Sequence, residues 1–223
     1  MIRENIFEVR KRIISACLKA GRAPETLKLI AVSKNRSPEE IKEALLAGIT
    51  AFGENRVQEA LLKYNAKELA LSAKPIEWHM VGHLQTNKVK DAVKIFDLIQ
   101  SVDSLRLAQE INKEALKINK VQEILLEVKI SPEATKFGLS PEETPAVIRE
   151  ASGFKNLKIK GLMAVAPILK SPEETRPYFR LLKDLRGRLD SKMILSMGMT
   201  DDFAVAIEEG SDMLRIGRAI FES

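Results

Sequence analysis

The stretch LKLIAVSKNR, Leu27–Arg36, decides how this chain is expected to fold. Residues 29–33 are apolar or small and two of them are β-branched, which favours a short buried strand over a helix. Lys34 follows directly, and the next letters, SPEE at Ser37–Glu40, predict a helix that begins with a capping box and a proline in its first turn. A lysine at the junction between a buried strand and a helix is well placed for chemistry.

The bulk composition indicates a globular protein of moderate charge. The chain has 223 residues, of which 45% are hydrophobic and 30% charged, so it can bury a core. Basic residues exceed acidic ones by 36 − 31 = 5, but the two signs alternate without a dense basic block. Nucleic-acid binding is therefore not indicated.

The compartment is inferred from what the sequence lacks. No run approaches the roughly 18 apolar residues of a membrane span, and the N-terminal letters MIRENIFEVRKR contain no apolar signal core. The single cysteine, Cys17, lies on the apolar face of the first predicted helix and is expected to be a core residue. One unpaired cysteine suits a reducing environment, so we expect a cytoplasmic protein.

Short apolar runs alternate with amphipathic stretches along the whole chain. We expect strands at 27–33, 49–53, 76–81, 95–102, 123–130, 158–165, 193–196 and 212–216, with helices between them and an extra helix at 2–20. Among the helices, 54–71 is expected to be continuous, and others are expected to start at Ser140 and at Thr200. The simplest architecture is an α/β fold, a single (β/α)8 TIM barrel over residues 1–223 with an additional N-terminal helix. An open doubly wound sheet is the alternative, but no Gly-x-Gly-x-x-Gly follows the first strand.

Polar residues and glycines gather where the predicted strands end, which is the active face of such barrels. Phosphate sites in this architecture favour the loops after strands seven and eight. Ser196 and Thr200 offer hydroxyl groups there, Gly198 permits close approach to an anion, and Thr200 is expected to open a helix. Gly217 follows the eighth strand.

A lysine together with a phosphate cradle indicates a phosphorylated carbonyl ligand. The amine of Lys34 would form a Schiff base with the carbonyl, and a dry strand end would favour the neutral amine that this needs. Pyridoxal 5′-phosphate (PLP) fits, and so does the substrate of a sugar-phosphate aldolase; a yellow protein would favour PLP. Arg215 would hydrogen-bond the pyridine nitrogen of PLP and keep it unprotonated.

The two histidines do not indicate a metal site. His79 and His83 are four apart but lie across a strand-to-loop junction, so helical metal-ligand spacing does not apply. His79 is expected to be either a satisfied core residue or a neighbour of the cofactor. Trp78 should point to the opposite face of the strand and pack against a helix.

Six motifs, in order along nearly the whole chain, resemble the pyridoxal phosphate homeostasis protein family. They are AVSK at Ala31–Lys34, FGEN at Phe52–Asn55, WHMVGHLQTNK at Trp78–Lys88, GLM at Gly161–Met163, LSMGMTDD at Leu195–Asp202 and RIGRAIF at Arg215–Phe221. The resemblance implies the barrel of the alanine racemase N-terminal domain. It also implies a protein that binds PLP, buffers or carries it in vitamin B6 homeostasis, and has no established catalytic reaction.

The resemblance assigns roles residue by residue. Lys34 is similar to the lysine that holds PLP covalently as a Schiff base, and Arg215 to the arginine that faces the pyridine nitrogen. Matches to the phosphate-side segments are Ser196, Gly198, Met199, Thr200 and Gly217, and matches near the cofactor are Asn55, His79 and Met163. The chain departs from the family pattern at Arg56, Thr86 and Glu222, none of which is among these residues.

A weak PLP-dependent amino-acid racemase is the rival interpretation. A racemase of the related type has a further β domain that supplies a second acid/base group across a dimer. The sequence ends at Ser223, directly after the predicted barrel, so we expect no efficient racemization and a monomer. PLP-dependent apo-enzymes are the expected recipients of the cofactor, and the sequence does not say which.

Overall fold

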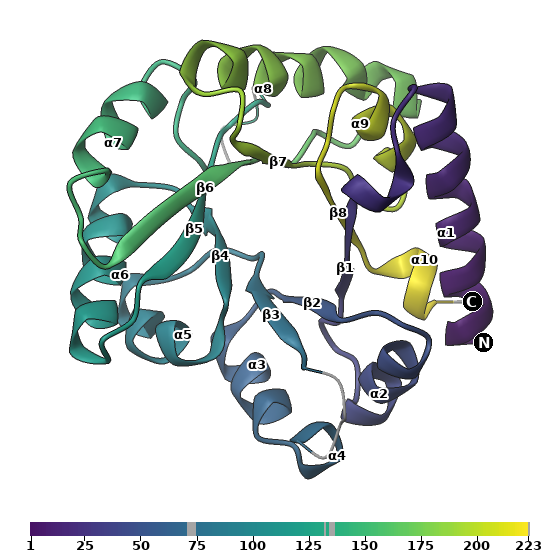
Figure 1. Ribbon diagram of the computed structural model, residues 1–223, viewed down its shortest axis with the longest axis horizontal. Helices are drawn as coiled ribbons and strands as arrows, with labels where there is room; N and C mark the ends of the chain where they lie inside the picture. The colour runs from purple at the N-terminus through teal and green to yellow at the C-terminus, as the bar shows by residue number, and fades with distance from the viewer. Residues whose placement is uncertain (71–74, 132, 134–136, 223) are drawn as a thin grey trace.

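Eight parallel strands close into a barrel in chain order, β1 to β8, in the part of the chain that the structure describes (Figure 1). The structure is a computed structural model, and it describes residues 1–70, 75–131, 133 and 137–222. The strands are β1 Lys28–Val32, β2 Ala51–Glu54, β3 Glu77–Met80, β4 Leu98–Val102, β5 Gln122–Glu127, β6 Leu157–Met163, β7 Ile194–Ser196 and β8 Met213–Ile216. The predicted (β/α)8 barrel is therefore confirmed, each strand lying within two or three residues of its expected position.

Helices surround the barrel and connect successive strands, as Figure 1 shows. The α-helices are α1 Ile2–Lys19, α2 Pro38–Leu46, α3 Val57–Tyr64, α4 Lys67–Ala70, α5 Val89–Ile95, α6 Leu105–Lys117, α7 Thr144–Ala151, α8 Arg176–Leu189, α9 Phe203–Glu208 and α10 Arg218–Phe221. Short 3-10 helices are η1 Pro24–Thr26, η2 Thr86–Lys88 and η3 Pro172–Thr175. None of the helices in the described residues is long and apolar enough to cross a membrane.

The predicted start of α2 is formed as the sequence indicates. The Ser37 hydroxyl accepts a hydrogen bond from the N–H of Glu40, and the Glu40 carboxylate accepts one from the N–H of Ser37 at 2.7 Å. This capping box satisfies two N–H groups that a helix end otherwise leaves free. It fixes where the chain turns from the Lys34 loop into α2.

The additional N-terminal helix packs against the last two helices of the chain. α1 buries one face, which includes Cys17, and lies beside α9 and α10 (Figure 1). The side-chain amide of Asn5 donates to the carbonyl of Ile220 at 3.1 Å. The expected core position of Cys17 is confirmed.

Three helix predictions are wrong in their boundaries. The helix expected over 54–71 begins only at Val57 and breaks at Asn65, with residue 71 outside the described residues. The helix expected from Thr200 begins at Phe203, since residues 200–202 form a turn. The helix expected from Ser140 begins at Thr144, because residues 141–143 also form a turn.

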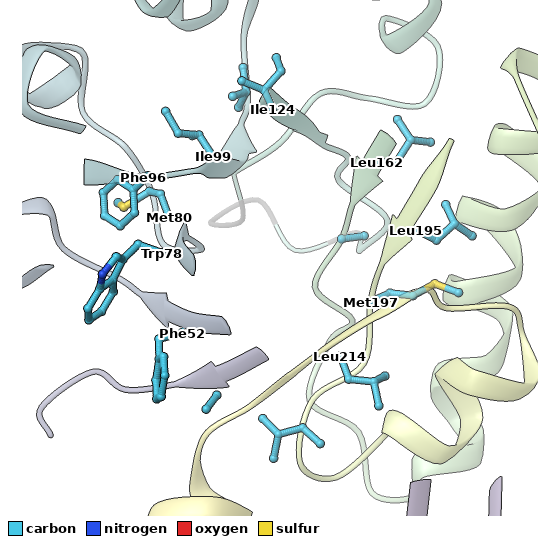
Figure 2. Close-up of a cluster of buried hydrophobic side chains, with 14 of the residues drawn as sticks. Phe52, Trp78, Met80, Phe96, Ile99, Ile124, Leu162, Leu195, Met197 and Leu214 are labelled. Carbon is cyan, nitrogen blue, oxygen red and sulfur yellow. The ribbon is translucent and has the colours of Figure 1, made fainter. Parts of the chain in front are cut away.

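Apolar side chains fill the layer between the strands and the surrounding helices. Figure 2 shows part of this layer, from Phe52 on β2 round to Leu214 on β8. Trp78 lies in it, with its ring centroid 6.0 Å from that of Phe52, so its predicted outward packing is confirmed. This outer layer holds most of the buried apolar surface and therefore drives closure of the barrel.

The inside of the barrel is only partly apolar. A small inner cluster consists of Ile30, Ala51, Leu98, Leu125, Met163 and Met213. Because strand side chains alternate, the residues two positions further along point into the barrel as well, nearer the C-terminal ends of the strands. Several of the residues at these positions are polar. Gln100 lies two residues after Leu98, Ser196 two after Ile194 and Arg215 two after Met213.

One glycine of β6 has no room for a side chain, and this generates a prediction. A Cβ on Gly161 would lie 2.0 Å from the carbonyl oxygen of Ile194 on β7, whereas one on Gly187, exposed in α8, would meet nothing within 4 Å. We expect Gly161→Ala to lower the free energy of unfolding by about 3 kcal/mol or more through overpacking. The control Gly187→Ala should raise it by about 0.5–1 kcal/mol through helix propensity. Urea unfolding of both variants checks this, and wild-type stability in Gly161→Ala would contradict the described packing of β6 on β7.

Candidate functional site

Lys34 lies in a turn two residues beyond the end of β1, and its side chain is exposed. The expectation of a dry strand end is therefore wrong for this lysine. The strand ends at Val32, and the turn that follows carries the chain out to the rim of the barrel. An exposed amine on the rim is open to a ligand that arrives from solvent.

The turn is held from below by a buried lysine that the sequence interpretation missed. Lys63 on α3 donates to the carbonyl of Ser33 at 2.6 Å, to Glu54 at 2.8 Å and to Glu59 at 2.7 Å. The Ser33 hydroxyl also donates to Glu54 at 2.6 Å. Burial raises the pKa of Glu54, although Lys63 and Ser33 oppose this effect. Lys63 and Ser33 thus satisfy one oxygen of the Glu54 carboxylate, Oε1, whereas the buried Oε2 has no hydrogen-bond partner among the described residues.

The residue on the other side of Lys34 is tied to the same network. The backbone N–H of Asn35 donates to Glu59, and Asn35 has a φ of 59°, a left-handed conformation that asparagine tolerates. Both neighbours of Lys34 therefore have fixed backbones. The amine moves on its own side chain, but its point of attachment does not.

Arg215 lies inside the barrel, on β8 next to β1. Its guanidinium donates to the Ser196 hydroxyl at 2.6 Å and to the carbonyl of Ala164 at 2.8 Å. Burial lowers the pKa of Arg215 to about 10, so the group remains charged at neutral pH. An arginine has five N–H donors, and these two bonds leave three for other acceptors.

A line of polar side chains continues from Arg215 across the barrel. Its links are Ser196 to Gln100 at 2.6 Å, Gln100 to His79 at 2.7 Å, His79 to Glu77 at 2.7 Å, and Lys28 to Glu77 at 2.5 and 2.6 Å. His79 is fully buried and both its ring nitrogens are engaged. The Ser196 hydroxyl is also fully buried and bonded to both Arg215 and Gln100, and its part in holding the phosphate stays a prediction.

The loops after β7 and β8 meet at the same rim. Gly198 has a φ of 96°, and a Cβ there would lie 2.6 Å from the Cβ of Ala206. Thr200 does not cap α9; its hydroxyl accepts the N–H of Ala219 in α10 at 3.4 Å. A Cβ on Gly217 would lie 3.2 Å from the carbonyl of Val32, so this loop passes close to the end of β1.

The remaining predicted residues occupy two places. Met163 is buried in the inner cluster, and Met199 is half-buried beside Gly198. Asn55 is half-buried at the rim, where a Cβ on Gly82 would lie 2.5 Å from its carbonyl oxygen. Asn55 also lines a cavity of about 400 Å³ between the loops after β2 and β3, together with the exposed Arg56.

The structure therefore brings the predicted residues to one end of the barrel, at two depths. Lys34, Asn55, Met199, Thr200 and Gly217 lie at or near the rim, and Met163, Ser196 and Arg215 lie below it. His79 lies further along the polar line. Among the described residues, no group of three or more His, Cys, Asp and Glu side chains could hold a metal ion.

Residues that the sequence interpretation missed are those that support others. Gln100 is the one amide in the buried strand LIQSV, and Glu77 opens the strand EWHM. A polar side chain at an inward position of a buried strand was the available signal. The sequence contains no such signal for Lys63, because it resembles the many other lysines on helix faces.

Comparisons with known proteins agree with this geometry. The sequence profile described as "Alanine racemase, N-terminal domain" matches residues 16–223. A protein of Aquifex aeolicus named "Pyridoxal phosphate homeostasis protein" is 45% identical over 98% of this chain and 96% of its own length. The solved structure of PipY from Synechococcus elongatus with PLP bound has a TM-score of 0.84 and 34% identity, covering 99% of this chain and 100% of that one.

A more distant structure shares the fold alone. An alanine racemase of Clostridium difficile has a TM-score of 0.73 at 16% identity. It covers 98% of this chain, whereas this chain covers 56% of it. The barrel is the part that the two proteins have in common.

The Glu77 carboxylate gives the first prediction about the site. Its hydrogen bond with His79, aided by Lys28, lowers the pKa of Glu77 from 4.5 to about 2 in the folded protein. A carboxylate with a lowered folded pKa stabilises the fold above its unfolded pKa and loses that contribution as the pH falls through its folded pKa. We expect Glu77→Gln to unfold more readily than wild type at pH 7, with the difference shrinking between about pH 4.5 and pH 2. Thermal or urea unfolding across this range checks it, and a difference that grows on acidification would contradict the assignment.

Proposed function

Because the chain belongs to the alanine racemase N-terminal domain family, and within it to the pyridoxal phosphate homeostasis proteins, we propose that it holds PLP as a Schiff base on Lys34. The function that follows is PLP homeostasis, in which a reactive aldehyde is kept bound and released on demand. The observation that carries the proposal is the convergence of three features at one end of the barrel: an exposed lysine on a fixed turn, two glycine-containing loops at the rim, and a buried arginine below it.

The residues at this end of the barrel match the three reactive or polar groups of PLP. PLP supplies an aldehyde that a lysine amine can bind covalently, a pyridine nitrogen that accepts a hydrogen bond, and a phosphate group. Lys34 supplies the amine and Arg215 has free N–H donors. Gly198 and Gly217 stand where a Cβ would collide with Ala206 or crowd Val32, so only glycine lets these two loops pack as they do. The backbone N–H groups of these loops are the proposed partners of the phosphate.

Each residue of the chain has a limited task in this proposal. The Lys34 amine is the nucleophile. Arg215 donates to the pyridine nitrogen and cannot pass a proton to it, since the pKa of Arg215 is about 10. The backbone of the loops around Met199, Thr200 and Gly217 binds the phosphate, and the side chains of Asn55, His79 and Met163 define the rest of the pocket.

The proposal is a binding function without established catalysis. An arginine at the pyridine nitrogen leaves that nitrogen unprotonated, which weakens PLP as an electron sink. The Aquifex aeolicus relative is named for homeostasis, and that name denotes no reaction.

Release to PLP-dependent apo-enzymes in the cytoplasm completes the proposal. The exposed position of Lys34 supports it, because an amine on the rim can exchange its ligand without opening the barrel. We also propose that residues 1–223 act as one domain and as a monomer.

Replacement of Lys34 tests the binding function directly. We expect wild-type protein mixed with PLP to turn yellow and to keep the ligand through gel filtration, because the ligand is covalently held. Lys34→Ala should lose the colour, whereas the control Lys42→Ala, an exposed lysine of α2, should behave as wild type. Colour retained through gel filtration in Lys34→Ala would contradict the assignment of the lysine.

A further inference from the structure

A continuous chain of hydrogen bonds crosses the barrel interior and ends on Arg215. Its members in order are Arg215, Ser196, Gln100, His79, Glu77 and Lys28. We propose that this chain positions the guanidinium of Arg215, with Gln100 and Glu77 as positioning residues. The inference deepens the proposed function and rests on it, since Arg215 is the residue that faces the pyridine nitrogen there.

The direction of donation along this chain of hydrogen bonds follows from Arg215. A guanidinium can only donate, so the Ser196 oxygen accepts from Arg215 at 2.6 Å. The single proton of the serine hydroxyl is then free for Gln100, whose Oε1 lies 2.6 Å away. The amide oxygen of Gln100 therefore faces Ser196, and its NH₂ group faces the other way.

The direction continues through the histidine. The Gln100 NH₂ lies 2.7 Å from Nδ1 of His79, and because an amide NH₂ can only donate, Nδ1 must accept. The proton of the neutral imidazole then sits on Nε2, which lies 2.7 Å from Oε1 of Glu77. The chain thus requires one tautomer of His79, the Nε2–H form.

The other end of the chain demands the same direction independently. Glu77 is a carboxylate that can only accept, and Lys28 donates to both its oxygens at 2.6 and 2.5 Å. The hydrogen bond from His79, together with Lys28, lowers the pKa of Glu77 to about 2 and keeps it ionised. A proton on Nε2 is what this carboxylate needs, so the two ends agree.

The reverse orientation of the amide fails. If the Gln100 NH₂ faced Ser196, the serine oxygen would receive two donors, from Gln100 and from Arg215. Its own proton would then lose the Gln100 oxygen, which is the acceptor that the structure gives it. Leaving a buried hydroxyl proton unpaired costs free energy, so a single arrangement of the chain is favoured.

Because the hydrogen-bond chain is buried, the position of Arg215 depends on every member of it. Gln100, His79 and Ser196 are all fully buried, so water is not available to replace a lost partner. Glu127 and Asp202 are the acidic groups whose charges act on Arg215, and Ala164 accepts one of its N–H groups. Ser196 fixes the second nitrogen, and Gln100 fixes Ser196.

The first test is the tautomer of His79, which does not depend on any ligand. ¹⁵N NMR of histidine-labelled protein at neutral pH should show protonated Nε2 and unprotonated, hydrogen-bonded Nδ1 for His79. His83, the only other histidine in the sequence, is assigned through His83→Gln. A proton on Nδ1 of His79, alone or together with one on Nε2, would overturn the proposed direction of the chain.

The second test removes Gln100 from the chain of hydrogen bonds. In Gln100→Leu, the Nη protons of Arg215 should change from separate NMR signals to averaged ones, because one side of the guanidinium loses its fixed partner. PLP affinity should fall about tenfold, because a displaced Arg215 would lose its hydrogen bond to the pyridine nitrogen. A factor of about ten is the cost of one hydrogen bond from a charged group. The control is Gln122→Leu, which removes another fully buried glutamine, on β5, whose amide donates to the backbone carbonyls of Asp97 and Glu123. It should leave the Arg215 signals and the affinity unchanged.

A pair of smaller substitutions covers the case in which Gln100→Leu fails to fold. Ser196→Ala removes a link of the chain, and Ser101→Ala removes a buried hydroxyl that has no partner in the described structure. We expect the first to reproduce the Gln100→Leu effects and the second to have none. Unchanged Arg215 signals and affinity in Ser196→Ala would overturn the inference.

Failure of this inference and failure of the proposed function are distinguishable. If wild-type protein does not bind PLP, the proposed function fails while the tautomer and the Arg215 signals still test the chain. If wild type binds PLP and the variants of Gln100 and Ser196 bind it equally well, the positioning role fails and the proposed function stands.

Discussion

A guanidinium buried inside a closed barrel is the constraint on which the rest of the site depends. Arg215 is charged at neutral pH, and the barrel wall excludes the water that would otherwise solvate it. The interior must therefore supply acceptors, and it does so with the Ala164 carbonyl and the Ser196 hydroxyl. Every further member of the polar line follows from satisfying the previous one, until the line reaches Lys28, about one third exposed at the opposite end of the barrel.

Lys34, the lysine proposed to bind the ligand, is exposed, in contrast to the buried Arg215. The residues on both sides of Lys34 are attached to the buried Glu54–Lys63 pair and to Glu59. A buried pair of this kind contributes little net stability, because desolvation offsets the attraction between the charges. Its consequence here is geometric: the turn is fixed while the amine remains accessible. The site thus combines a rigid buried cation with a mobile amine on a rigid turn.

The sequence was sufficient for the architecture because strand and helix periodicity repeats eight times. It was sufficient for the position of Lys34, since a strand followed by a capping box determines where the turn must lie. It failed for Thr200, because a threonine before two aspartates resembles a helix start, whereas the helix begins only at Phe203. Tertiary contact decided that case: the Thr200 hydroxyl accepts the N–H of Ala219 in α10.

The supporting residues could not be identified from the sequence for a different reason. Gln100 and Lys63 act through partners that are distant along the chain, so their roles appear only when the barrel closes. Ser196 was placed in the right region, but its hydroxyl serves Arg215. Local patterns thus predicted which residues gather at the site, and long-range contacts determined what each one touches.

Lys34 is the residue that we propose to hold PLP. Borohydride reduction of the PLP-loaded protein, followed by peptide mass spectrometry, tests it most directly, because reduction makes a lysine–ligand bond permanent. We expect one modified peptide, carrying the ligand on Lys34. Modification of another lysine with Lys34 unmodified, or no modified peptide at all, would contradict it.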